Sequence, residues 1–181
     1  MKICIIGTHS TGKTTLVNEL AKHFKDKGKQ TKTISELSRL CPHPINETTN
    51  IDAQTWILNE QMRYEDLYQM TGSWVFCDRG TIDNFAYLER AANDQPIEHL
   101  LTKAVEHMKT YDLVFKTVKL DKKALEDGVR STDDEFRDDI DARITRLLEE
   151  HDIAHVLLPE SLDVNKHINF VGDVIYKQSL A

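Results

Sequence analysis

Hydrophobic and polar positions follow two different periods along the chain. Short apolar runs, such as residues 2–6, are typical of strands that are buried on both faces. Between these runs, apolar residues return every three or four positions, as Leu16, Leu20 and Phe24 do, which predicts helices that cover a sheet. Residues 41–50 contain two prolines among polar side chains and predict a loop.

The pattern predicts a series of strands and helices in alternation. The expected strands are residues 2–6, 31–35, 74–77, 113–118 and 154–158. The expected helices run from about Lys13 to Gly28, over 52–70, 82–92, 97–109 and about 136–148, and from about 164 to 177. On the 52–70 helix, the residues expected to share one apolar side are Trp56, Ile57, Tyr64, Leu67 and Tyr68.

This alternation predicts one α/β domain over residues 1–181, with a parallel sheet between layers of helices, because parallel strands need crossover connections. Active sites of such sheets lie at the carboxyl ends of the strands. We therefore expect the chemistry just after Ile6, Ser35, Cys77 and Val118.

Composition and charge narrow the class of protein. A hydrophobic content of 40% with 29% charged residues is ordinary for a globular domain. A net charge of −7 makes nucleic acid and anionic membranes poor partners. There is no secretory pattern and no apolar run long enough to cross a bilayer. Cys4, Cys41 and Cys77 form no metal-binding pair or disulfide framework, so we expect a cytoplasmic protein.

Residues 7–14, Gly-Thr-His-Ser-Thr-Gly-Lys-Thr, match the phosphate-binding pattern G-x-x-x-x-G-K-[ST] between a strand and a helix. The glycines let backbone N–H groups approach phosphate oxygens, and the helix dipole favours the same anion. Lys13 would contact the β- and γ-phosphates of ATP, and the Thr14 hydroxyl would bind Mg²⁺. His9 would contribute its backbone rather than its imidazole. The expected nucleotide contacts are Gly7, His9, Ser10, Thr11, Gly12, Lys13, Thr14 and Thr15.

Glu36 follows the second expected strand, and Arg39 comes three residues later. A carboxylate at this strand end would face the phosphate loop, where it can accept the proton of an acceptor hydroxyl. Arg39 would then contact the acceptor. The alternative is an exposed ion pair, which would add little to stability.

Asp78 and Arg79 follow the third expected strand, and Asp83 lies in the first turn of the next helix. Asp78 suits Mg²⁺, directly or through water, but it competes with Glu36 for the role of base. Arg79 can bind phosphate or the acceptor with its planar group, and Asp83 would line the acceptor pocket. Alternatively, Asp78 caps the helix and Asp83 only favours the helix dipole.

A lid is expected over about residues 120–137, because this polar stretch contains Asp127-Gly128-Val129-Arg130. Arg130 and Arg137 would close over the triphosphate, exclude water and stabilise charge in the transition state. The acidic residues around Arg137 can neutralise it, which makes Arg130 the stronger candidate.

These strand-end signals together resemble the small P-loop kinases of nucleosides and nucleotides. The segments 35–39 (Ser-Glu-Leu-Ser-Arg), 77–83 (Cys-Asp-Arg-Gly-Thr-Ile-Asp) and 127–130 are most similar to the AAA-type ATPase/kinase domain of the NadR kind, which includes ribosylnicotinamide kinases. The resemblance implies a five-stranded parallel sheet of order 2-3-1-4-5 in a three-layer P-loop fold. It also implies an acceptor pocket formed by Glu36, Arg39, the 52–70 helix and residues 78–83. The chain lacks the prolines expected after the fourth strand and has Lys-Leu-Asp-Lys-Lys at residues 119–123 instead.

Three functions are compatible with these signals. The first is ATP- and Mg²⁺-dependent phosphoryl transfer to a small hydroxyl acceptor, such as a nucleoside, a nucleotide or a vitamin riboside. The second is an ATPase or nucleotide-binding switch without an acceptor. The chain has no N-K-x-D element of a GTPase, and Arg79 stands where motors of the AAA type carry Glu. The third is a polynucleotide kinase, which needs a basic groove that this acidic chain does not predict.

Overall fold

The computed structural model describes residues 1–45, 49–119 and 134–179. Its strands are β1 (Lys2–Ile6), β2 (Thr31–Ile34), β3 (Trp74–Asp78), β4 (Leu113–Lys116) and β5 (Val156–Leu157). Its helices are α1 (Lys13–Asp26), the 3₁₀ helix η1 (Leu37–Leu40), α2 (Ile51–Gln69), α3 (Thr81–Ala92), α4 (Glu98–Met108), α5 (Asp134–Glu150) and α6 (Val164–Ser179).

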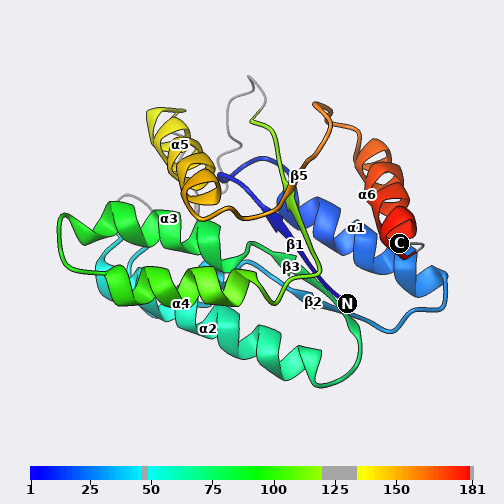
Figure 1. Ribbon diagram of the computed structural model, residues 1–181, viewed down its shortest axis with the longest axis horizontal. Coiled ribbons are helices and arrows are strands. Elements are labelled where there is room, and N and C mark those ends of the chain that lie inside the picture. Colours follow the sequence, from blue (N-terminus) through cyan, green and yellow to red (C-terminus); the bar gives the residue numbers. More distant parts are fainter. Residues whose placement is uncertain (46–48, 120–133, 180–181) are drawn as a thin grey trace.

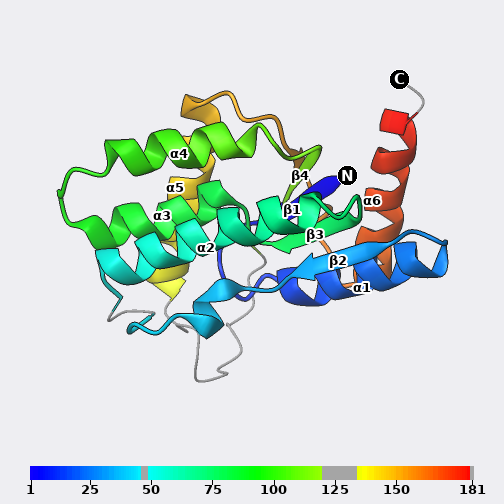
Figure 2. The ribbon, with the colours of Figure 1, turned by 90° about the horizontal axis from the view of Figure 1, so that it is seen from below.

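The strands form a parallel sheet in the order β2-β3-β1-β4-β5, which confirms the expected α/β fold and strand order. Helices α1 and α6 cover one face of the sheet, whereas α2, α3, α4 and α5 lie on the other (Figures 1 and 2). This arrangement gives three layers and places the carboxyl ends of β1, β2 and β3 next to one another.

Strand β1 lies at the centre of the sheet, and every one of its residues is buried. Because successive side chains of a strand point to opposite faces, Ile3 and Ile5 pack against α1 and α6. Cys4 and Ile6 belong to the core on the other face. Burial on both faces explains why this strand is a continuous apolar run in the sequence.

Three strands are shorter than expected: β2 ends one residue early, at Ile34, and β4 and β5 are limited by the pairing available to them. The fourth strand was expected to reach Val118, but β4 ends at Lys116, which pairs with Ile6, the last residue of β1. Only Phe115 and Lys116 pair with β5, so that strand is limited to two residues. Thr117 therefore stands directly at a strand end, beside the phosphate loop.

The buried face of α2 differs from the apolar side expected for it. Leu67 is 50% exposed, whereas Gln61 and Glu65 are 1% and 0% exposed. These polar side chains find hydrogen-bond partners in the interior. The expectation that Leu67 shares the buried side was wrong. A prediction from helical spacing uses only the polarity of each residue and does not take such hydrogen-bond partners into account.

In the part of the chain that the structure describes, no helix combines the length and apolar character needed to span a bilayer.

We expect Asn50→Ala to lower the free energy of unfolding by about 1 kcal/mol, because Asn50 caps α2. Its Oδ1 accepts a hydrogen bond from the backbone N–H of Ala53 at 2.9 Å. Asn50→Asp keeps this acceptor and is the matched control. Urea unfolding of the two variants measures the difference, and an equal loss of stability in both would contradict the capping role.

Candidate active site

The phosphate loop begins where β1 ends, and its backbone takes conformations that suit glycine. Gly7 has φ +138° and Gly12 has φ +83°. A Cβ on Gly7 would lie 2.1 Å from the Oγ1 of Thr117, so a side chain does not fit there. Gly12 is the N-cap of α1, which directs the positive end of the helix dipole at the loop. The loop thus has the geometry that the sequence pattern predicts.

Lys13 is 5% exposed, and its Nζ donates a hydrogen bond to the Thr8 carbonyl at 2.6 Å. Burial, followed by the charge of Arg79, lowers the pKa of Lys13 to about 8. Asp78, Asp83 and Glu36 act in the opposite direction, which means that all three carboxylates lie close enough to influence the ammonium group.

The Oγ1 of Thr14 donates a hydrogen bond to the Oδ2 of Asp78 at 2.5 Å. The two residues come from the first turn of α1 and the last position of β3, which are brought together by the pairing of β1 with β3. A hydroxyl and a carboxylate oxygen side by side are ligands that suit Mg²⁺.

Arg79 connects the ends of three strands. Its Nε and Nη2 donate to the Oε1 of Glu36 at 3.1 and 2.7 Å, and its Nη1 lies 3.5 Å from the Gly7 carbonyl and from the Oδ2 of Asp83. Arg79, Glu36 and Asp83 are all buried. Arg39 is exposed at the edge of this group, with its Nε 3.6 Å from the Oε2 of Glu36.

Asp83 joins the phosphate loop to the turn that follows β3. Its Oδ1 accepts from the Gly80 N–H at 2.7 Å, and its Oδ2 accepts from the Gly7 N–H at 3.4 Å. Burial raises the pKa of Asp83 to about 6, although Arg79 and Lys13 pull it down. Asp83 is 0% exposed, so its contacts in this structure are with the site itself.

Aromatic residues form a wall beside these charges, and the sequence analysis missed their role. The Arg79 guanidinium lies 4.7 Å from the ring centre of Tyr87, whose hydroxyl is 3.3 Å from the Nδ1 of His9. The rings of His9 and Tyr87 are 5.6 and 6.1 Å from that of Phe136 in α5. Tyr87 follows Asp83 by one helical turn, a spacing that could have identified it.

Thr117 was also missed, because the fourth strand was expected to end later. It is 4% exposed, and its Oγ1 lies 2.8 Å from the Oγ1 of Thr11. The same Oγ1 donates to the Ile6 carbonyl at 3.2 Å, so Thr117 links the last residue of β1 to Thr11 within the phosphate loop.

The expected lid falls mostly on residues 120–133, and Arg130 with them lies outside the described residues. Residues 134–137 form the first turn of α5. Arg137 is 2% exposed, and its Nη1 pairs with the Oδ1 of Asp134 at 2.8 Å. An acidic neighbour of Arg137 was expected, whereas its almost complete burial was not.

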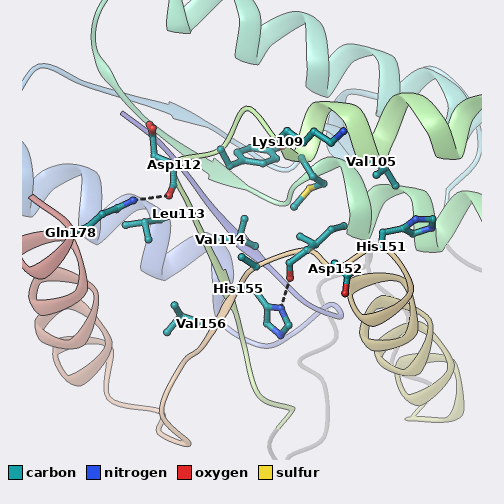
Figure 3. Close-up of a pocket in the computed structure, with 14 residues that line it drawn as sticks. Val105, Lys109, Asp112, Leu113, Val114, His151, Asp152, His155, Val156 and Gln178 are labelled. Atoms are coloured by element: carbon teal, nitrogen blue, oxygen red, sulfur yellow. Dashed lines mark hydrogen bonds between the residues drawn. The ribbon is translucent and has the colours of Figure 1, made fainter. Parts of the chain in front are cut away.

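A hollow of about 460 Å³ lies at the opposite end of the sheet, around the amino ends of β4 and β5 (Figure 3). Its lining combines apolar side chains, such as Val105 and Val156, with polar groups bonded within the protein. Gln178 donates to the Asp112 carbonyl, and the Nδ1 of His155 lies 2.9 Å from the Ile153 carbonyl (Figure 3). This hollow is separate from the strand ends that carry the phosphate loop.

Comparison with known proteins places the chain in a family. A family model described as an AAA domain matches residues 2–165, so the chain belongs to that family. No curated protein matches the chain.

Solved structures share its fold. The NadR protein in complex with NR has a TM-score of 0.74 and 21% identity over 95% of this chain and 50% of that chain. The chain thus spans half the length of that NadR chain. Deoxyadenosine kinase from M. mycoides has a TM-score of 0.67 and 16% identity over 98% of this chain and 100% of its own. Thymidylate kinase from Ehrlichia chaffeensis has a TM-score of 0.62 and 15% identity over 98% and 97%. The expected resemblance to P-loop kinases is confirmed at the level of the fold.

We expect Lys13→Ala to weaken the binding of Mg²⁺-ATP by about 10- to 100-fold or more, because a charged hydrogen bond contributes about 1.5–3 kcal/mol. Isothermal titration calorimetry measures the effect, with exposed Lys22→Ala on the same helix as the control. Unchanged affinity in the Lys13 variant would contradict the assigned role.

Proposed function

We propose that the chain transfers the γ-phosphoryl group of ATP, with Mg²⁺, to the hydroxyl of a small acceptor such as a nucleoside, a nucleotide or a vitamin riboside. The proposal rests on one arrangement of side chains around Lys13. The carboxylates of Asp78, hydrogen-bonded to Thr14, and of Glu36, hydrogen-bonded to Arg79, both lie near the Lys13 ammonium group. The fold of NadR, whose structure contains NR, and of a deoxyadenosine kinase with dCMP bound supports this class of acceptor.

Thr14 and Asp78 would hold Mg²⁺. Magnesium commonly takes only one or two protein ligands and completes its shell with phosphate oxygens and water. A magnesium site therefore does not need three or more His, Cys, Asp or Glu side chains. Among the described residues, no such group is arranged to hold a metal ion. When bound, Mg²⁺ would neutralise part of the charge of the triphosphate.

Glu36 is the better candidate for the base, because Asp78, which is hydrogen-bonded to Thr14, is assigned to Mg²⁺ and a metal-bound carboxylate is a poor proton acceptor. In the transfer step, the acceptor oxygen would form a bond to the γ-phosphorus while the bond to the leaving oxygen of ADP breaks. The hydroxyl proton would pass to the Glu36 carboxylate. Arg79 would orient Glu36 through its two hydrogen bonds to Oε1.

Lys13 and Arg79 would balance the charge that develops on the phosphoryl oxygens. Arg79 is already engaged with two carboxylates, so it would act mainly by fixing their positions. Arg130 and Arg137 stay candidates for further charge stabilisation. Arg39, exposed at the rim, would contact the acceptor from the solvent side.

The acceptor can be identified by measuring ADP release from Mg²⁺-ATP in the presence of nucleosides, nucleotides and vitamin ribosides. We expect at least one compound to stimulate release and to gain a phosphoryl group, as detected by mass spectrometry. Steady release that no compound stimulates would overturn phosphoryl transfer in favour of an acceptor-independent ATPase.

The two carboxylates are distinguished by Glu36→Gln and Asp78→Asn. We expect Glu36→Gln to lower the rate of transfer about 100-fold or more while ATP affinity is preserved, since general base catalysis contributes about 10²–10⁴-fold. Asp78→Asn should instead raise the Mg²⁺ concentration needed for half-maximal rate.

Exposed Glu106→Gln, which makes the same chemical change outside the site, is the control. Full transfer activity in both carboxylate variants would rule out the proposed base and metal ligand together.

A further inference from the structure

The turn that carries Arg79 has an unfavourable backbone conformation. Arg79 has φ +92°, a value that residues with a Cβ rarely adopt. Gly80 follows it, and a Cβ there would lie 3.1 Å from the Cγ2 of Ile6 and 3.2 Å from the Sγ of Cys4. Such a conformation persists only when its surroundings determine it strongly. The contacts that hold this turn therefore matter for the direction in which the Arg79 side chain points.

Side chains from three different segments hold the main chain of residues 79–81. Gln61 in α2 donates from Nε2 to the Arg79 carbonyl at 3.2 Å. Asp83 accepts from the Gly80 N–H at 2.7 Å, and the Tyr111 hydroxyl accepts from the Thr81 N–H at 3.2 Å. Asp83 belongs to the site already described, whereas Gln61 and Tyr111 contact the turn from outside that site.

Gln61 and Tyr111 are both anchored by Glu65, which lies one helical turn after Gln61 on α2. Oε1 of Glu65 accepts from the Nε2 of Gln61 at 2.6 Å and from the hydroxyl of Tyr111 at 2.7 Å. The same Nε2 reaches the Arg79 carbonyl, so one carboxylate oxygen fixes two of the three contacts that hold the turn.

The other oxygen of Glu65 has its own partners. Oε2 lies 3.1 Å from the Nζ of Lys2 and 2.8 Å from the Nε2 of His107. Lys2 and Glu65 have fully buried side chains. Burial alone would raise the pKa of Glu65, but the hydrogen bond from His107, the charge of Lys2 and the bonds from Tyr111 and Gln61 together lower it. The carboxylate is therefore charged and accepts hydrogen bonds from every side.

A buried ion pair is a weak source of stability, since apolar side chains of similar volume often serve as well. The hydrogen bonds around Glu65 are better explained by the geometry that they impose, because hydrogen bonds have preferred directions and apolar contacts do not. We infer that Glu65 is a positioning residue, which acts through Gln61 and Tyr111 to keep the turn at residues 79–81 in the shape that aims Arg79 at Glu36. The effect on rate rests on the proposed function, whereas the effect on the turn does not.

Two conservative variants test the inference in the full chain. Gln61→Met keeps the length of the side chain and removes its bonds to Glu65 and to the Arg79 carbonyl. Tyr111→Phe removes only the hydroxyl between Glu65 and the Thr81 N–H. Glu60→Gln is the matched control, because Glu60 lies next to Gln61 but is only partly buried and pairs with the exposed Arg63.

We expect amide hydrogen exchange at Gly80 and Thr81, measured by NMR, to become at least ten-fold faster in both test variants. Exchange in β1 should stay the same, because the sheet is not altered. The rate of acceptor-dependent ADP formation at saturation should fall about ten-fold, while the KM for Mg²⁺-ATP is unchanged. In an Arg79→Lys background, Gln61→Met should have little further effect, since coupled residues are not additive.

A lower melting temperature with unchanged exchange at residues 80–81 and an unchanged rate would overturn the inference and leave Glu65 a purely structural role. If Gln61→Met does not fold, the same measurements on Tyr111→Phe decide. If no acceptor stimulates ADP formation by the unmodified chain, the proposed function fails, and the exchange rates alone decide whether Glu65 holds the turn.

Discussion

The contact between Arg79 and Glu36 is the interaction on which the geometry of the site depends. Through it, the segment after β3 is joined to the segment after β2, and the Nη1 of Arg79 extends the connection to Gly7 at the end of β1. The pairing of the strands brings these segments into range, but it does not fix the directions of their side chains. A planar guanidinium with several donors does so, because each donor needs an acceptor in a defined direction. A lysine at this position would supply the charge without the directions.

The site is also a balance of buried charges. Lys13 and Arg79 lie among Glu36, Asp78 and Asp83, and each would be unfavourable in the interior by itself. The balance explains why burial shifts the pKa of Lys13 only to about 8. Substitution of one charged residue would leave an opposite buried charge uncompensated, so it would affect the other charged residues of the site as well.

The sequence alone was sufficient for the features that have a local signature. The phosphate loop at residues 7–14 follows from its spacing and the parallel sheet from periodicity, whereas the strand order follows from the resemblance to P-loop kinases. Features that arise from contacts between distant segments were not predictable in this way. Thr117 lies beside the loop because of where β4 stops pairing, and Gln61 is buried because the Arg79 carbonyl offers it a partner. Helical periodicity predicted that Leu67 shares the apolar side of its helix, but Leu67 is half exposed. Periodicity reflects only the hydrophobicity of residues along one helix and contains no information about polar partners on other segments.

The order of the strands separates two tasks within the sheet. The phosphate loop follows β1 and Asp78 ends β3, both in the interior of the sheet, whereas Glu36 follows β2, which forms a border of the sheet. Strand β2 pairs with β3 alone, so residues of the border segment beyond Glu36, such as the exposed Arg39, can change without disturbing the inner strands. Under the proposed function, a change of acceptor could therefore be confined to the rim of this border segment, while the phosphate loop and Asp78 keep their positions in the interior of the sheet.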